Sequence, residues 1–209
     1  MARPSADRAV ENLLRRQGFV RIAGVDEAGR GCLAGPVMAG AVVLDPGRHI
    51  PGLRDSKQLT PAARDRLYDA IVAGALAWGV EEVGPAEIDR LNIRQASLLA
   101  MRKAVMAIAP LPDFVLVDAF LIPDLPMAQR GIVHGDAQCS AIAAASIVAK
   151  VTRDRFMTRL HEADSRYGFD RHKGYPTPDH ARAIGLYGLS PAHRRSFRVP
   201  PPLAPLDPA

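Results

Sequence analysis

Two apolar runs, residues 19–26 and 36–44, constrain the fold of this chain more than any other feature. Both are rich in valine, isoleucine and alanine, and only a short glycine-bearing segment separates them. This spacing predicts two antiparallel strands joined by a tight connection. Further strands are expected at about 77–83, at 114–118 and ending near 132–133. Strands first, and then strands alternating with helices, predict an α/β protein with a mixed sheet flanked by helices.

Four helices are expected in the same part of the chain. The first covers residues 5–17, with Ser5 as its N-cap. Its buried stripe is expected to consist of Val10, Leu13 and Leu14. The pair Thr60-Pro61 puts a capping threonine before a proline at the first helical position, which predicts a helix to about residue 76. The other two are expected over 93–108 and over the alanine-rich segment 137–163.

The texture of the chain changes after residue 165, where arginine, histidine, glycine, tyrosine and proline dominate. Thr177-Pro178 and Ser190-Pro191 repeat the capped-helix pattern, so a small helical appendage is expected here. The proline-rich tail, residues 199–209, is expected to be extended or disordered. We therefore expect a main domain over 1–164, a C-terminal helical extension over 165–198 and a tail over 199–209.

The composition is compatible with a nucleic-acid partner. Lysine and arginine outnumber aspartate and glutamate by 27 to 22, and 48% apolar residues suffice for a sizeable core. Cys32 and Cys139 match no metal or redox spacing and are expected to be reduced thiols of a cytoplasmic protein. No apolar stretch approaches the ~20 residues that span a membrane, and residues 1–17 do not resemble a secretory signal.

The segment from Gly24 to Gly31 contains the most informative chemistry. Two adjacent acids, Asp26 and Glu27, close the first apolar run, and the glycine-flanked Arg30 follows them. Carboxylate oxygens are the ligands that Mg²⁺ prefers, and glycines let a backbone approach a ligand closely. A metal-binding pair beside an open cationic loop favours a site that grips and cuts a phosphodiester.

Two more acids occur where elements begin or end. Asp118 follows a buried strand, and the carboxyl ends of strands are where α/β sheets bind ligands. Asp136 precedes the alanine-rich helix, where it either caps the helix or faces the same cleft. Four acids together repel one another, and two divalent ions about 3.5–4 Å apart would neutralise them and promote phosphoryl transfer. Because neighbouring strand residues point to opposite faces, Asp26 and Glu27 can share a site only if the strand twists or ends between them.

Several motifs together carry a resemblance to a known family. They are GVDEAGRG at 24–31, LAGPV at 33–37, DSK at 55–57, VD at 117–118, GD at 135–136, AAASIVAKVTRD at 143–154 and HKGY at 172–175. In order and in content they closely resemble bacterial ribonuclease HII, from about residue 20 to about residue 195.

The resemblance implies a ribonuclease H-like catalytic domain over 1–164 and a small C-terminal helical extension over 165–198 that binds substrate. It implies an endonuclease that cuts the RNA strand of RNA–DNA hybrids and cuts 5′ to single ribonucleotides in duplex DNA, leaving 3′-hydroxyl and 5′-phosphate ends. It also implies Mg²⁺ or Mn²⁺ as cofactor, with two ions during catalysis. The implied catalytic metal ligands are Asp26, Glu27, Asp118 and Asp136.

The same resemblance implies how the substrate is bound. Gly29, Arg30 and Gly31 would read the ribose 2′-hydroxyl through backbone groups and hold the neighbouring phosphate. Tyr175 would stack on the deoxyribose just past the junction. The candidate phosphate contacts are Lys57, Lys150, Arg153 and Lys173.

Some neighbouring residues invite simpler interpretations or depart from the family pattern. Ser146 is expected to serve close helix packing, and Asp154 to pair with Arg153 or Arg155. The departures are Cys32 where proline is usual, Ala119 where glycine is usual and His134 where lysine is common. His134 is expected to line the cleft or face solvent.

Three other functions stay open. A nucleic-acid-binding module of the same fold without cleavage would be marked by the loss of one acid, and all four are present. A phosphatase or nucleotide hydrolase would want a G-x-x-x-x-G-K-[ST] loop, which does not occur. The sister enzyme ribonuclease HIII usually carries an additional N-terminal domain. We expect a monomer, and a replication clamp is a conceivable partner that no residue pattern supports.

Overall fold

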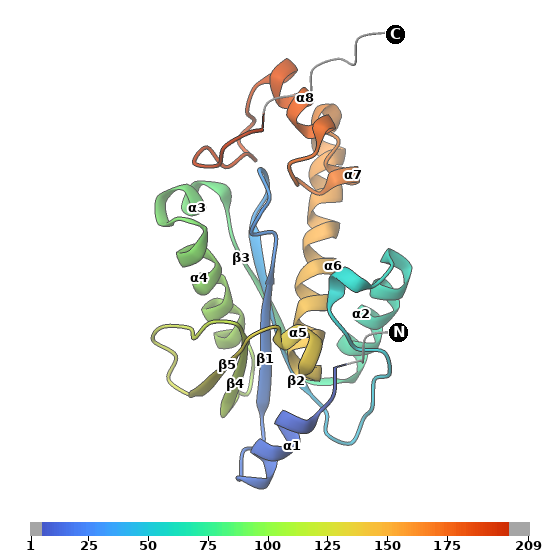
Figure 1. The fold of residues 1–209 in the computed structure, drawn as a ribbon, viewed down its shortest axis with the longest axis vertical. Coiled ribbons are helices and arrows are strands. Elements are labelled where there is room, and N and C mark those ends of the chain that lie inside the picture. The colour runs from blue at the N-terminus through green and yellow to red at the C-terminus, as the bar shows by residue number, and fades with distance from the viewer. Residues whose placement is uncertain (1–5, 201–209) are drawn as a thin grey trace.

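A five-stranded sheet in the order β3-β2-β1-β4-β5 forms the centre of the computed structural model, which describes residues 6–200 (Figure 1). The strands are β1 Ile22–Ala28, β2 Val37–Leu44, β3 Ala75–Val83, β4 Phe114–Asp118 and β5 Ala128–Ile132. β1 and β2 are antiparallel, as are β2 and β3, whereas β4 runs parallel to β1 and β5 parallel to β4. The predicted antiparallel pair and the predicted mixed sheet are both confirmed.

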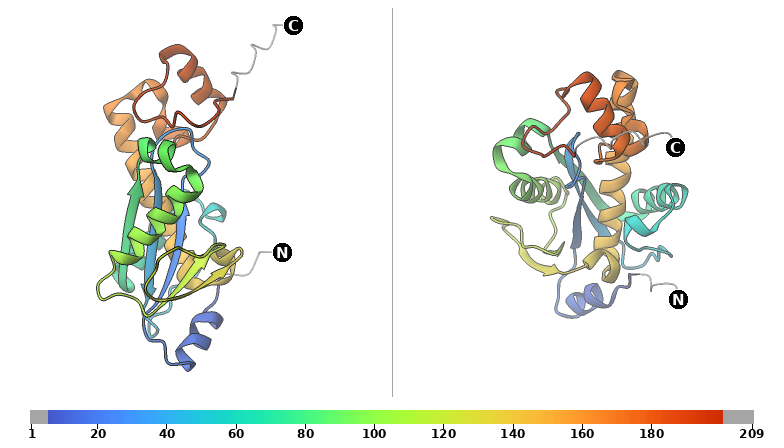
Figure 2. Two further views of the ribbon diagram at one scale, coloured as in Figure 1. Left: turned by 90° about the vertical axis from the view of Figure 1, so that its left-hand side faces the viewer. Right: turned by 45° about the horizontal axis from the view of Figure 1, so that its top comes forward.

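Helices cover both faces of this sheet. They are α1 Ala9–Arg16, α2 Pro61–Gly74, α3 Pro85–Leu91, α4 Ile93–Met106, α5 Gly135–Gln138, α6 Ser140–Ala163, α7 Phe169–His172 and α8 Pro178–Tyr187. α4 packs on one face, and α6 packs on the other with α2 beyond it (Figure 2). Of the helices in the described part of the chain, none combines the length and the apolar run that crossing a bilayer requires.

The first three helices agree only in part with the capping signals in the sequence. α2 begins as predicted, with the Thr60 hydroxyl accepting the N–H of Ala63, and ends at Gly74. α1 begins at Ala9, with the Asp7 carboxylate accepting the Ala9 N–H, and the proposed cap Ser5 lies outside the described residues. Leu14 is buried, but Leu13 is 43% exposed, so its prediction as a core residue is wrong. The short helix α3 was not predicted.

The alanine-rich segment forms two helices where one was predicted. Cys139 has an extended backbone, with φ −116° and ψ 122°, and separates α5 from α6. Gly24 lets α6 lie close against β1, because a Cβ atom added at Gly24 would collide with the backbone of Ala141. This close approach brings the side chains of α6 next to the acids of β1.

The C-terminal helices lie at the far end of α6, against the connection between β1 and β2 (Figure 1). α8 begins as predicted, with the Thr177 hydroxyl accepting the His180 N–H at 3.3 Å. The helix predicted at Ser190-Pro191 is absent, because Ser190 directs its N–H and its hydroxyl to the His193 ring. The domain boundaries at 164/165 and 198/199 stay predictions, and residues 201–209 of the tail lie outside the described part.

Candidate active site

A cavity of about 440 Å³ opens where β1 and β4 end. It brings together three of the four predicted acids, the glycine loop, two of the three predicted lysines and the predicted tyrosine. The lining residues are Asp26, Glu27, Ala28, Gly29, Arg30, Gly31, Ser56, Lys57, Asp118, Ser146, Lys150 and Tyr175. Residues from 26 to 175 in the chain therefore meet at one place.

The end of the β1–β4 ladder explains how two neighbouring acids line one cavity. The parallel pairing of these strands stops at Val25 and Val117, while β1 stays paired with β2 as far as Ala28. Beyond Val25, the edge of β1 that faces β4 is therefore open. Asp26 and Glu27 both border this opening, which resolves the alternation problem posed by their sequence positions.

Burial and mutual repulsion dominate the electrostatics of Asp26. Its side chain is buried, and burial raises its pKa well above the usual value, with further contributions from the negative charges of Glu27 and Asp118. A hydrogen bond from Ser146 acts in the opposite direction. The Ser146 hydroxyl is also 2.9 Å from that of Ser56, so Ser146, predicted only to pack, supports a site residue.

Glu27 and Asp118 each have one fixed partner. Glu27 Oε1 accepts a hydrogen bond from Arg30 Nη1 at 3.1 Å, and burial raises its pKa although Arg30 opposes the shift. Asp118 Oδ1 accepts the N–H of Gly135 at 2.8 Å, which ties the end of β4 to the start of α5. The remaining carboxylate oxygen of Asp118 is free of any such backbone bond in the described residues.

Asp136 lies at the edge of this group, on α5. Burial, followed by the negative charges of Asp55 and Asp118, raises its pKa to about 6. Lys57 supplies the nearby positive charge. Burial would lower the pKa of Lys57, but the charges of Asp55, Asp26, Asp136 and Asp118 outweigh it and raise that pKa. Asp55 is an acid of this group that the sequence motif contained but that was not predicted as a site residue.

The carboxylates of these acids lie around the cavity but do not converge on a single metal position. Within residues 6–200, no three acidic, histidine or cysteine side chains stand close enough together to hold an ion as they are. Like charges in a partly buried cleft repel one another, and the Glu27–Arg30 and Asp118–Gly135 contacts hold individual oxygens aside. Small side-chain rotations would be needed for these carboxylates to share a cation.

A buried arginine shapes the glycine loop from within. Arg194 donates to the carbonyl oxygens of Gly29, Arg30 and Gly35 at 2.8, 2.9 and 3.0 Å. Gly29 has φ +93°, a conformation that favours glycine. In the described residues, the N–H groups of Arg30 and Gly31 have no hydrogen-bond acceptor, so they are available to a ligand. The arginine pair at 194–195 gave no sequence signal for this role.

Arg153, predicted to contact phosphate, does not do so in this structure. Its side chain is fully buried and donates to the carbonyl oxygens of Ala34, Pro36 and Lys173 at 2.9–3.0 Å. No surface of its guanidinium is left for a ligand. Arg153 is therefore a structural residue that joins the connection after the glycine loop to the C-terminal extension, and its assignment as a phosphate contact is wrong.

Tyr175 lines the same cavity as the acids, and its side chain is partly exposed. The ammonium of Lys150 lies 5.4 Å from the centre of its ring and donates to Asp154 at 2.7 Å. Asp154 also pairs with Arg64 at 3.5 Å, and not with Arg153 or Arg155 as predicted. Cys32 is buried beside Tyr175, and burial raises the pKa of its thiol.

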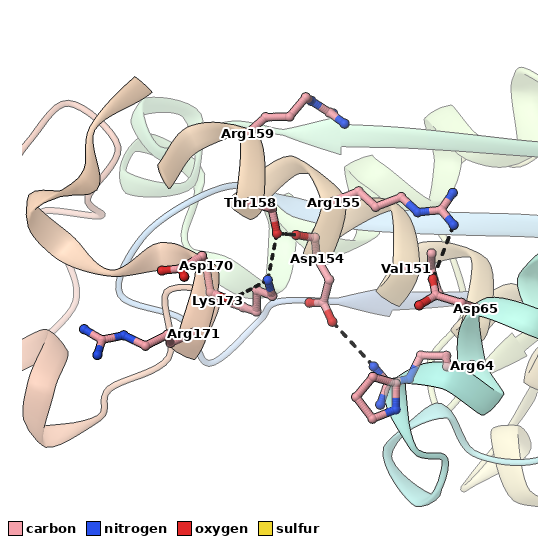
Figure 3. Close-up of a pocket in the computed structure, with 11 residues that line it drawn as sticks. Arg64, Asp65, Val151, Asp154, Arg155, Thr158, Arg159, Asp170, Arg171 and Lys173 are labelled. Carbon is pink, nitrogen blue, oxygen red and sulfur yellow. Dashed lines mark hydrogen bonds and ion pairs between the residues drawn. The ribbon is translucent and has the colours of Figure 1, made fainter. Parts of the chain in front are cut away.

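Lys173 belongs to a second, larger cavity of about 600 Å³ between α2, α6 and α7 (Figure 3). Its ammonium donates to the Thr158 hydroxyl at 2.8 Å and to the Asp170 carbonyl at 2.7 Å. The side chain thus turns away from the cavity that holds the acids. Four arginines also line this second cavity: Arg64, Arg155, Arg159 and Arg171.

Two departures from the family pattern have left-handed backbones. Ala119 has φ +61° and His134 has φ +55°, a region that few residues other than glycine adopt and in which asparagine, aspartate and histidine are enriched but alanine is not. Glycine is therefore the unstrained residue after Asp118, as the resemblance implied. The His134 side chain is exposed, in agreement with its predicted solvent-facing position.

Comparisons with known proteins identify the family of this chain. The family model of ribonuclease HII matches residues 23–199. A ribonuclease HII of Dehalococcoides mccartyi is 52% identical over 193 residues, which cover 91% of each chain. One of Thiobacillus denitrificans is 56% identical over 180 residues, covering 86% of this chain and 88% of the relative.

Solved structures show the same fold. The ribonuclease H2 of Pyrococcus horikoshii superposes with a TM-score of 0.73 at 29% identity, over 86% of this chain and 95% of that one. The ribonuclease HII of Archaeoglobus fulgidus, solved in complex with PCNA, gives 0.72 at 25% identity, over 87% and 96%. A ribonuclease HIII solved with Mn²⁺ shares the fold at a TM-score of 0.60 and 24% identity, over 94% and 73%. Since the family model and the bacterial relatives agree over most of its length, this chain belongs to the ribonuclease HII family and is an endoribonuclease of the ribonuclease H class.

Proposed function

We propose that this endoribonuclease cleaves the RNA strand of RNA–DNA hybrids and cuts duplex DNA on the 5′ side of single ribonucleotides, using divalent metal ions. The observation that carries this proposal is the shared cavity, in which Asp26, Glu27 and Asp118 face the glycine loop and Tyr175. Acids that can hold a metal and a loop that can read a ribose are thereby within reach of one nucleotide.

The donor set fits Mg²⁺ or Mn²⁺. The four acids offer only oxygen ligands, which hard divalent cations prefer. Burial, with a smaller contribution from neighbouring carboxylates, raises the pKa values of Asp26, Glu27 and Asp136, and a bound cation would favour their charged forms. A relative of the same fold was solved with Mn²⁺. We assign Asp26, Glu27, Asp118 and Asp136 as the residues that would hold two ions.

The chain's own residues hold the substrate in line for hydrolysis. Bound ions would activate the attacking water and stabilise the charge on the leaving oxygen. A new bond forms between this water oxygen and phosphorus, and the bond from phosphorus to the 3′-oxygen of the preceding nucleotide breaks. The products are a 3′-hydroxyl and a 5′-phosphate. Lys57 and Lys150, both on the cavity wall, supply positive charge to the phosphate groups.

Recognition of the ribonucleotide is assigned to the glycine loop and Tyr175. The free N–H groups of Arg30 and Gly31 can bond to the 2′-hydroxyl, which is the group that separates a ribose from a deoxyribose. The Arg30 side chain, 42% exposed, is available to the adjacent phosphate once it leaves Glu27. Tyr175 can stack on the next sugar, where the ring leaves no room for a hydroxyl.

A cleavage assay tests the proposal. The substrates are a duplex with one ribonucleotide, an all-DNA duplex and an RNA–DNA hybrid, each with Mg²⁺, Mn²⁺ or EDTA. Asp118→Asn is the informative variant, because an asparagine Oδ1 can still accept the Gly135 N–H and preserve the local fold. We expect a metal-dependent cut 5′ to the ribonucleotide in wild type and a loss of at least about 100-fold in kcat for the variant, as for removal of a group that stabilises the transition state.

Asp124→Asn is the matched control, because the Asp124 side chain is 81% exposed and its ion pair with Arg102 is long, at 3.8 Å. It should retain wild-type activity. If the wild type binds the duplex but cuts it with neither metal, the silent-binding alternative replaces this proposal. Equal losses in both variants would contradict the assignment of Asp118.

Assembly and location complete the proposal. We expect a monomer, to be checked by analytical ultracentrifugation, and a cytoplasmic location stays a prediction. The complex of the archaeal relative with PCNA makes a sliding clamp the partner to test, by co-sedimentation with the clamp of the same cell. No feature of residues 6–200 is assigned to that contact.

A further inference from the structure

Three imidazoles are packed together in the C-terminal extension, next to the segment that carries Tyr175. His172 ends α7, His180 lies in α8, and His193 lies in the segment that returns to the β1–β2 connection. The rings of His172 and His180 are stacked with their centroids 4.3 Å apart, and His180 and His193 are 5.2 Å apart. His180 and His193 are almost completely buried, among the rings of Tyr167 and Phe169.

Backbone groups determine which nitrogen of each ring carries its proton. The Ser190 N–H donates to Nδ1 of His193 at 3.0 Å, so a neutral His193 carries its proton on Nε2. Nε2 of His180 lies 3.0 Å from that group and must accept it. The proton of His180 is therefore on Nδ1, which donates to the Tyr175 carbonyl at 2.9 Å.

His172 is ordered by the same logic. The Gly174 N–H donates to Nδ1 of His172 at 3.1 Å, so its proton is on Nε2 and is donated to the Tyr167 carbonyl at 2.7 Å. Each of the three rings thus uses one donor and one acceptor, with neither left unpaired. The hydrogen bonds and the stacking of these rings are thus both satisfied within the extension.

We infer that His172, His180 and His193 are positioning residues for Tyr175, whose ring they aim across the glycine loop, and that they thereby set the preference for a ribonucleotide followed by a deoxyribonucleotide. The hydrogen bonds run in one direction, from Ser190 through His193 and His180 to the Tyr175 carbonyl. The inference rests on the role proposed above for Tyr175.

The peptide groups around Tyr175 show why these rings control it. His172 accepts the N–H of Gly174, and His180 donates to the carbonyl of Tyr175. The Gly174 carbonyl in turn accepts the N–H of Leu33 at 2.8 Å. The backbone on both sides of the tyrosine is therefore fixed relative to the glycine loop. The Tyr175 ring, in a residue that is 38% exposed, also has Lys150 and Arg153 at 5.4 and 5.9 Å from its centre, so the direction of its backbone decides which face it turns to the cavity.

The order of protons requires neutral rings. A proton added to Nε2 of His180 would face the N–H of His193 at 3.0 Å, and a proton added to Nδ1 of His193 would face the Ser190 N–H at 3.0 Å. Burial lowers the pKa of all three rings, that of His180 to about 4. The charged groups that face the cluster are Asp164 near His193, and Asp170, Arg171 and Asp179 near His172. The chain of bonds is thus complete at neutral pH.

Two substitutions at one position separate positioning from stability. In His180→Asn the amide nitrogen takes the place of Nδ1 and keeps the bond to the Tyr175 carbonyl. In His180→Gln the amide reaches the place of Nε2, which keeps the contact with His193 but not the bond to Tyr175. Both variants remove the same aromatic ring and the same stacking on His172.

The measurement is kcat/KM on a duplex with one ribonucleotide and on a continuous RNA–DNA hybrid, at a temperature where thermal unfolding shows each variant to be folded. We expect His180→Gln to lower kcat/KM on the single-ribonucleotide duplex about tenfold, the equivalent of one buried hydrogen bond, with a smaller decrease on the hybrid. His180→Asn should stay within about threefold of wild type. In a Tyr175→Ala background, His180→Gln should cause no further decrease.

Equal decreases in the two His180 variants, or a full further decrease in the Tyr175→Ala background, would overturn the inference while leaving the proposed function intact. If Tyr175→Ala itself leaves the ratio between the two substrates unchanged, the proposed role of Tyr175 fails and the inference fails with it. Nitrogen NMR of the imidazoles gives an independent check, since a proton found on Nε2 of His180 would also overturn it.

Discussion

Single residues buried behind the loop decide the shape of the active site. Arg153 and Arg194 each satisfy three backbone carbonyls, and together they hold the glycine loop and its continuation. Burial lowers the pKa of Arg194 to about 10, which still leaves it charged at neutral pH. A charged guanidinium here replaces the hydrogen bonds that a buried loop cannot obtain from water.

Replacing Arg194 tests this role at the scale of one residue. Arg194→Met removes the guanidinium from the carbonyls of Gly29, Arg30 and Gly35, of which Gly29 keeps only the Cys32 N–H at 3.4 Å, so we expect the free energy of unfolding to fall by about 3 kcal/mol. Urea unfolding measures it. The neighbouring Arg195→Met is the control, because the Arg195 side chain is exposed and its change should stay within about 0.5 kcal/mol. Similar decreases in the free energy of unfolding for both variants would contradict this role of Arg194.

At the scale of elements, α6 connects the two cavities. Its residues Ser146, Lys150, Asp154 and Thr158 recur every four positions and so lie along one face of the helix. The first two line the cavity with the acids, and the last two line the cavity with the arginines (Figure 3). A nucleic acid whose scissile phosphate lies among the acids would thus meet positive charge further along the same helix.

Neutralising that second cavity should weaken substrate binding more than chemistry. We expect Arg155→Gln combined with Arg159→Gln to raise KM with little change in kcat. The slope of log KM against log salt should decrease by about 1 for each phosphate that the protein no longer neutralises. Arg16→Gln combined with Arg102→Gln removes the same charge from α1 and α4 and should leave the slope unchanged. A slope that changes equally in both double variants would assign the effect to net charge alone.

At the scale of the whole molecule, the active site joins the two ends of the sequence. The connection after β1 receives hydrogen bonds from Arg153 in α6 and from Arg194 near the C-terminus, and Tyr175 arrives from between α7 and α8. Stability of the C-terminal extension is therefore part of the geometry of the cleft. Its buried histidines make that stability depend on pH.

Acid should weaken the extension through His180. Because its pKa falls from 6.5 to about 4 on folding, only the unfolded chain takes up this proton between those values. The contribution of His180 to the free energy of unfolding is thus complete above pH 6.5. It is lost as the pH falls toward 4, by up to about 3 kcal/mol. The raised pKa values of Asp26 and Asp136 act in the opposite direction, since those acids favour the folded state at low pH.

Comparing wild type with His180→Asn isolates the histidine, because the acids contribute equally to both proteins. Urea unfolding in EDTA from pH 7.5 to 4 gives the difference in unfolding free energy between them. We expect this difference to be largest above pH 6.5 and to shrink as the pH falls. A difference that is constant over the whole range would show that His180 carries no such shift.

Much of this protein follows from its sequence because the deciding signals are local. Two apolar runs predict β1 and β2, and the Thr60-Pro61 cap predicts α2. Acids at the ends of strands predict the group around Asp26 and Asp118. A strand brings its last side chain to the edge of the sheet whatever else the chain does. The motif resemblance adds the substrate class by the same local evidence.

Only the tertiary structure decided which cations line the cavity that holds the acids. Arg153, Lys150 and Lys173 have equal standing in the sequence, yet one is buried, one lines the cavity with the acids and one turns to the second cavity. The role of Arg194 and the bonding of the three histidines depend in the same way on segments far apart in the chain. Burial and hydrogen-bond partners are properties of non-local packing, so no pattern within a few residues could reveal them.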